Sequence, residues 1–177
     1  MAGVADEIFR TICSRYGNVN LFTEMISAKA LTFNDKKTKT LFPKEHEGKM
    51  IVQLFGHEPE IMAKAAKMAE EYATEININM GCPMPKIAGN GDGSALMANP
   101  CLAKEMVKAA KEAVSVPVTV KFRKGIKEDT AVDFALAMQE AGADKIYIHG
   151  RTKEQLYSGK ADYETIKNVK MRFLFPL

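Results

Sequence analysis

The chain has 177 residues, enough for one domain with a sizeable core, and 46% hydrophobic and 27% charged residues are ordinary for a globular protein. No apolar run has the length of a membrane span, and the N-terminus lacks a basic segment followed by an apolar one, so we expect a cytoplasmic protein without membrane contact. A net charge of +3 does not by itself indicate nucleic acid, and three cysteines without metal-ligand spacing favour neither a disulfide framework nor a metal site.

Hydrophobic periodicity predicts alternating helices and strands along the chain. Apolar residues with helical spacing, such as Ile8, Phe9 and Ile12, mark the helices, and glycine or proline marks most ends. The predicted elements, in chain order, are a helix over 8–16, a strand over 19–25, an irregular polar segment over 26–48, a strand over 50–55, a helix over 59–72, a strand over 75–80, a helix over 100–114, a strand over 117–123, a helix over 131–141, a strand over 145–149 and a helix from about 162.

This alternation predicts parallel strands joined by crossover helices, either in a doubly wound sheet or in a (β/α) barrel. Polar residues able to take part in binding or catalysis stand at the C-terminal ends of four successive strands: Gln53, Asn79 with Cys82, Lys121 with Arg123, and His149 with Arg151. In a barrel the ends of these strands surround one mouth, whereas an open sheet concentrates its site at one switch point. We therefore prefer the barrel. A complete barrel needs eight strands, so the predicted fold is an incomplete α/β (β/α)8 TIM barrel, about strands two to six of eight.

The best candidate for chemistry is Cys82. It follows the strand predicted over 75–80 and stands between Gly81 and Pro83, two residues that constrain the backbone. Most free cysteines are small buried apolar residues, and that interpretation suits the other two, which lie in or beside predicted helices. The position of Cys82 at the carboxyl end of a strand favours a functional thiol.

Other candidates stand near the ends of neighbouring strands. Lys121 and Arg123 share one strand face, because side chains repeat every second residue. A lysine that points into a barrel is unfavourable unless it meets an anion or an electron-rich cofactor, and an internal salt bridge fits the spacing equally well. His149 is either a hydrogen-bonded core histidine or a site residue, and Gln53 is a weak candidate by itself.

Several motifs carry a resemblance to a known family. The central one is Asn77-Ile-Asn-Met-Gly-Cys-Pro83, with Lys86 and Gly93 after it. The others are Met1-Ala-Gly-Val4, Thr23-Glu-Met25, Ser27-Ala-Lys29, Val52-Gln-Leu-Phe-Gly56, Val120-Lys-Phe-Arg123, His149-Gly-Arg-Thr152 and Tyr157-Ser-Gly-Lys-Ala-Asp162. In this order they resemble the motifs of the tRNA-dihydrouridine synthases, flavin enzymes that reduce selected uridines in transfer RNA, and the resemblance extends to about Lys170.

The resemblance implies reduction of the C5–C6 double bond of specific tRNA uridines to 5,6-dihydrouridine, with FMN as cofactor, NADPH as reductant and tRNA as partner. The implied roles are catalytic acid for Cys82, FMN binding for Met1, Ala2, Gln53, Lys121 and His149, and substrate binding for Asn79, Arg123 and Arg151.

The resemblance also implies a domain assignment. Residues 1–170 would be part of an FMN-binding TIM-barrel catalytic domain, and 171–177 would be a divergent tail. The C-terminal helical tRNA-binding domain of the family would be absent. We therefore expect a fragment that is inactive alone and that self-associates through unpaired barrel edges.

Two other functions stay open. One is a flavin-dependent oxidoreductase acting on free pyrimidines, as in the dihydropyrimidine dehydrogenases, which have a similar Ser-Cys-Pro turn. The other is a non-catalytic fragment that binds RNA or assembles with another chain. Activity on free uracil but not on tRNA would favour the first, and purified protein without flavin would favour the second.

Overall fold

The computed structural model describes residues 3–17 and 19–172. The strands are β1 (Ile26–Ser27), β2 (Met50–Phe55), β3 (Ala73–Met80), β4 (Val118–Arg123) and β5 (Lys145–His149). The helices are α1 (Glu7–Ser14), α2 (Ala28–Thr32), α3 (Lys36–Lys39), α4 (Pro59–Ala69), α5 (Pro85–Ala88), α6 (Pro100–Ala113), α7 (Ala131–Glu140) and α8 (Tyr163–Arg172), with short 3-10 helices over Glu45–Glu47, Glu70–Tyr72 and Gly93–Ala98. No helix in these two ranges is long and apolar enough to cross a bilayer.

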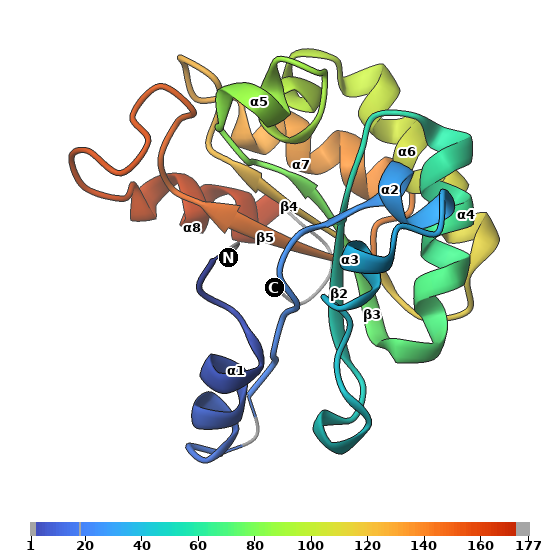
Figure 1. The fold of residues 1–177 in the computed structure, drawn as a ribbon. Helices are drawn as coiled ribbons and strands as arrows, with labels where there is room; N and C mark the ends of the chain where they lie inside the picture. The colour runs from blue at the N-terminus through green and yellow to red at the C-terminus, as the bar shows by residue number, and fades with distance from the viewer. Residues whose placement is uncertain (1–2, 18, 173–177) are drawn as a thin grey trace.

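The five strands form one parallel sheet in which each strand pairs with its neighbour in the sequence. A doubly wound sheet reverses its strand order at a switch point, and this sheet does not. Helices α4, α6 and α7 follow successive strands and lie together against the sheet (Figure 1). This is the arrangement of part of a (β/α)8 barrel, so the predicted fold class is confirmed.

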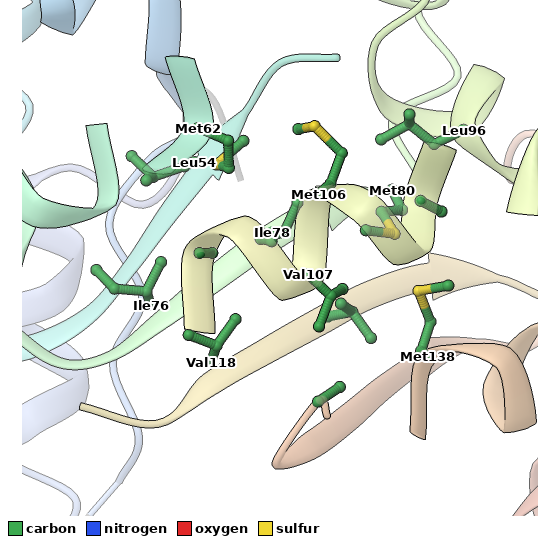
Figure 2. Close-up of a cluster of buried hydrophobic side chains, with 14 of the residues drawn as sticks. Leu54, Met62, Ile76, Ile78, Met80, Leu96, Met106, Val107, Val118 and Met138 are labelled. Atoms are coloured by element: carbon green, nitrogen blue, oxygen red, sulfur yellow. The ribbon is translucent and has the colours of Figure 1, made fainter. Parts of the chain in front are cut away.

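The hydrophobic core lies between the sheet and these helices. Alternate residues of β3 and β4, among them Ile76, Ile78 and Val118, are fully buried on the helix side. Figure 2 shows them beside Met106 and Val107 of α6. Burying an aliphatic side chain of this size contributes about 1.5–3 kcal/mol, so this layer fixes the direction of every strand residue between the buried ones.

The intervening residues put polar side chains on the opposite face of the sheet. Gln53 lies beside Asn77 in the ladder of β2 and β3, and Asn79 lies beside Lys121 in the ladder of β3 and β4. In a barrel this face is the interior and its carboxyl end is the mouth. The fold therefore brings the polar residues predicted from separate motifs to one surface.

Two predictions for the N-terminal part are wrong. The segment 19–25 forms only an isolated bridge between Phe22 and Ile51, and the first ladder strand is β1. The Thr23 hydroxyl accepts the Gln53 N–H at 3.0 Å, so a side chain occupies a position that a ladder bond would take. The segment predicted as irregular over 26–48 contains β1, α2 and α3, because side-chain caps at the two helix starts stabilise them.

Helix α1 is confirmed, but its apolar stripe faces solvent. Ile8, Phe9 and Ile12 are 70%, 46% and 47% exposed. Arg10 is buried instead, and its guanidinium donates to both carboxylate oxygens of Glu47 at 2.8 Å. A buried ion pair therefore attaches α1, which lies apart from α4, α6 and α7 (Figure 1).

Candidate active site

Cys82 lies in the turn after β3, and hydrogen bonds hold the backbone on both sides of it. Oδ1 of Asn79 accepts the N–H of Gly81 at 3.1 Å and that of Cys82 at 2.9 Å. The Cys82 carbonyl accepts the Ser94 N–H at 3.0 Å. The residue is 9% exposed, so the thiol is held at the carboxyl end of the sheet in a fixed, nearly buried turn.

Gly93 makes this turn possible. Its φ of +59° lies in the left-handed region, and a Cβ at this position would lie 2.9 Å from the Cys82 carbonyl oxygen and 3.1 Å from Cγ2 of Ile87. Both conditions require glycine. The buried Ser94 hydroxyl beside it has no hydrogen-bond partner in the described ranges.

The Asn79 amide is fully engaged with the protein. Its Oδ1 accepts two backbone N–H groups, and its Nδ2 donates to Oε1 of Gln53 at 3.0 Å and to Sδ of Met25 at 3.1 Å. These four contacts exhaust its hydrogen-bonding capacity. Nε2 of Gln53 donates to Oδ1 of Asn77 at 2.7 Å, which leaves Gln53 one further amide N–H.

Lys121 is half-buried on the same face and has neither a hydrogen bond nor a salt bridge to any described residue. Glu75, a buried carboxylate of β3, pairs with Lys145. Burial above all, and the Arg123 charge next, lower the pKa of the Lys121 ammonium, while a charge on Cys82 raises it. In the described part of the chain, the alternative of an internal salt bridge is therefore wrong for Lys121.

His149 is neutral at pH 7. Burial, followed by the charges of Arg123, Lys121 and Arg151, lowers its pKa to about 4. Its Nε2 lies 3.3 Å from Nη1 of Arg151, a contact in which the guanidinium donates and the neutral ring accepts. The proton of the ring is then on Nδ1. The ring also lies 6.0 Å from that of Tyr157.

Arg123 and Arg151 bind backbone carbonyls of the loop after β5. Arg123 is 3% exposed and donates to the carbonyls of Gly81, Thr152 and Leu156 at 2.9, 3.0 and 2.9 Å. Arg151 donates to the carbonyls of residues 158 and 159 at 3.2 and 3.0 Å. Both arginines therefore shape the rim of the site, and Arg123 connects this loop to the Cys82 turn.

The structure brings most of the predicted site residues together. Lys121 and Arg123 both lie close enough to Cys82 for a charge there to raise their pKa values. His149 lies beside Arg123 in the ladder of β4 and β5. Met1 and Ala2 lie outside the described residues, so their roles stay predictions. No three His, Cys, Asp or Glu side chains within 3–17 and 19–172 gather into a possible metal site.

Sequence reasoning missed one contact near the site. Nδ1 of His57, after β2, lies 2.7 Å from Oδ1 of Asp92, and Asp92 is buried in the loop that returns to the Cys82 turn. The pair borders a groove of about 470 Å³ that Lys86 also lines. No spacing in the sequence connects Asp92 with His57.

Comparison with known proteins gives one consistent result. The family described as "Dihydrouridine synthase (Dus)" matches residues 1–177. The chain is 40% identical over 181 residues to "tRNA-dihydrouridine synthase B" of Shewanella oneidensis, with 100% of this chain and 56% of that protein covered. It is 39% identical over 181 residues to "Probable tRNA-dihydrouridine synthase 1" of Synechocystis sp., with 100% and 51% covered. The chain thus spans about half the length of the curated relatives it matches.

Proposed function

Because the chain belongs to the dihydrouridine synthase family, we propose that it carries the catalytic face of a tRNA-dihydrouridine synthase. The reaction is reduction of the C5–C6 double bond of specific tRNA uridines to 5,6-dihydrouridine, with NADPH as reductant and FMN as cofactor. The observation that carries the proposal is the Cys82 thiol, held by Asn79 on a face that also presents Lys121, a cation without a partner among the described residues.

The polar face suits the pyrimidine ring of a flavin. Lys121 is a cation without a carboxylate partner among the described residues, so it favours an electron-rich or anionic group. His149 is neutral, and Gln53 keeps one amide N–H for an acceptor. FMN, when bound, would supply the hydride, which no side chain can provide.

Cys82 holds the proton that C5 of uracil needs. A thiol that donates its proton becomes a thiolate, and the positive charges of Lys121 and Arg123 are close enough to stabilise it. The nearly buried position excludes most water from the thiol, which strengthens these charge interactions. General acids of this kind typically contribute about 10²–10⁴-fold to the rate.

A contact from Asn79 to the target uridine requires one of its present partners to leave. The thioether sulfur of Met25 is its weakest acceptor, so a uracil carbonyl would replace that contact and leave the two bonds to the Cys82 turn intact. Arg151 and Arg123 would lie at the rim beside cofactor or RNA, with their backbone contacts keeping the rim in shape.

The test uses a chimaera in which the remaining sequence of the Shewanella relative is joined to this chain. With FMN, NADPH and unmodified tRNA, we expect dihydrouridine to form, and Cys82→Ala to retain flavin but lose about 10²–10⁴-fold in rate. Cys101→Ala is the matched control, because Cys101 is exposed. Equal rates for Cys82→Ala and the parent would contradict the assignment. Reduction of free uracil but not of tRNA would favour a free-pyrimidine enzyme.

A further inference from the structure

A series of hydrogen bonds, all pointing in one direction, connects the Cys82 turn to a buried carboxylate. The turn follows the carboxyl end of β3, and the carboxylate is that of Glu75, near the amino end of the same strand. The bonds run from the Cys82 N–H to Oδ1 of Asn79 (2.9 Å), from Nδ2 of Asn79 to Oε1 of Gln53 (3.0 Å), from Nε2 of Gln53 to Oδ1 of Asn77 (2.7 Å), from Nδ2 of Asn77 to Oγ1 of Thr119 (2.8 Å), and from the Thr119 hydroxyl to Oε1 of Glu75 (2.8 Å). We call this series the amide relay.

The carboxylate sets the direction of the relay. Glu75 forms an ion pair with Lys145 and accepts the Tyr147 hydroxyl at 2.8 Å, so it is an acceptor. The Thr119 hydroxyl must then donate to Glu75, and its oxygen is left to accept an N–H from Asn77.

The direction passes from one amide to the next. The NH₂ group of Asn77 donates to Thr119, so its carbonyl oxygen faces Gln53 and accepts from the Gln53 NH₂ group. The carbonyl oxygen of Gln53 then faces Asn79 and accepts from the Asn79 NH₂ group. Asn79 therefore turns its oxygen to the backbone. With the opposite amide orientation, its NH₂ group would face the N–H groups of Gly81 and Cys82, and all three would be donors.

Burial makes the alternative orientation unfavourable. The five relay side chains are between 0% and 6% exposed. Water cannot satisfy a reversed amide at such a position, and a buried unpaired donor loses its full hydration. Adjacent hydrogen bonds in such a series also strengthen one another.

We propose that Glu75, Asn77 and Thr119 are positioning residues for Cys82, which act through Gln53 and Asn79 to hold the thiol turn in one geometry. None of the three touches the thiol. The importance of that geometry for catalysis rests on the proposed function, but the geometry itself can be measured on the thiol without any reaction.

The experiment measures alkylation of Cys82 by iodoacetamide in the 177-residue chain. Thr119→Val removes the hydroxyl and keeps the shape, and Thr119→Ser keeps the hydroxyl. We expect alkylation of Cys82 to rise about threefold to tenfold in Thr119→Val, because the turn opens more often without the bond that orients the relay. Thr119→Ser should return the rate to within about twofold of the parent.

Two controls separate positioning from general loosening. The exposed Cys101 is an internal reference whose alkylation should not change. Thr165→Val removes another buried hydroxyl that donates to a carboxylate, that of Asp129, outside the relay, and should leave the Cys82 rate at the parent value. A folded Thr119→Val protein with the parental Cys82 rate, or a Thr165→Val protein with an equal rise, would overturn the proposal.

A measurement on the parent covers the case in which Thr119→Val does not fold. The relay requires the N–H groups of Gly81 and Cys82 to exchange with deuterium at least about 100-fold more slowly than in an unstructured peptide. Exchange at the unstructured rate would disprove the relay. An active Cys82→Ala chimaera would refute the proposed function instead and would leave the alkylation result unaffected.

Discussion

The guanidinium of Arg123 donates to the carbonyl of Gly81 across 2.9 Å, so the last residue of β4 holds the turn that carries Cys82. The same side chain donates to the carbonyls of Thr152 and Leu156. One buried cation thus joins the loop after β3 to the loop after β5.

Replacement of this cation should destabilise the fold. We expect Arg123→Met to lower the free energy of unfolding by about 2–4 kcal/mol, because three carbonyls lose a charged donor in a buried site. Urea denaturation measures it. Arg151→Met is the matched control, since its two carbonyl contacts are exposed, and its effect should stay below about 1 kcal/mol. Equal losses of unfolding free energy in the two variants would show that the buried Arg123 contacts stabilise the fold no more than the exposed Arg151 contacts.

Gly93 should tolerate no side chain. Gly159→Ala introduces an alanine at a φ of +64° with one ordinary contact, 3.7 Å from Nε2 of Gln155, so it measures mainly backbone strain, about 1–2 kcal/mol. Gly93→Ala adds a clash with the Cys82 carbonyl to a similar strain, so the loss should be larger by about 1–3 kcal/mol. Urea denaturation of both variants gives the difference in the free energy of unfolding. Equal losses would mean that the Cys82 turn shifts to accommodate the added Cβ at no cost.

Lys121→Met should weaken flavin binding in the chimaera. We expect about a tenfold rise in the FMN dissociation constant and slower flavin reduction by NADPH, because a cation leaves the polar face. Fluorescence titration and stopped-flow absorbance measure the two quantities. Lys124→Met is the control, because Lys124 is held by Asp162 at 2.6 Å. No change in either quantity would make Lys121 a structural lysine.

His149 should make stability depend on pH. Its pKa is about 4 in the folded chain and near 6.5 when unfolded, so the unfolded chain binds the proton more readily. The free energy of unfolding is therefore highest above pH 6.5 and falls as the pH drops towards 4. Between about pH 7 and pH 5 few carboxylates titrate, so urea denaturation in this window reports mainly on histidines.

A histidine exchange tests the source of this slope. His149→Gln should flatten the decline between about pH 7 and pH 5, whereas the exposed His46→Gln should retain it. An NMR titration of the His149 ring should give a midpoint near 4. A midpoint at the ordinary histidine value would contradict the burial argument.

The isolated 177-residue chain should self-associate. The exposed stripe of α1 is apolar, and β5 pairs on one side only, with β4, within the described residues. Sedimentation velocity should show oligomers that decrease when Ile8→Lys is introduced. Leu136→Lys, at an exposed apolar residue on α7, is the control and should have little effect. A monomeric parent would contradict the prediction.

Much of the fold follows from local patterns. The strands predicted over 50–55 and 145–149 match β2 and β5 residue for residue, because each is a short run rich in β-branched, aromatic or other apolar residues and is followed by glycine. The N-terminal errors have a tertiary cause: Thr23 replaces a ladder bond to Gln53. The burial of Arg10 depends in the same way on Glu47, a residue 37 positions away.

The site was predictable only as a set of positions. Strand alternation and motif resemblance place Cys82, Lys121 and His149 at neighbouring strand ends. The full engagement of Asn79 and the partner of Glu75 depend on the register between β2, β3, β4 and β5, which no single stretch of sequence specifies. No local sequence pattern therefore predicts the amide relay.

The order of the sheet has a consequence for biosynthesis. Each strand pairs with the strand before it, so every new strand leaving the ribosome finds its partner already made, and the sheet can grow in the direction of translation. The Cys82 turn does not reach its final contacts in this order. Cys82 emerges with β3, whereas Thr119 and Tyr147, which orient and anchor the far end of the relay, arrive with β4 and β5. The contacts that fix the geometry of this turn can therefore form only some time after the cysteine itself has been made.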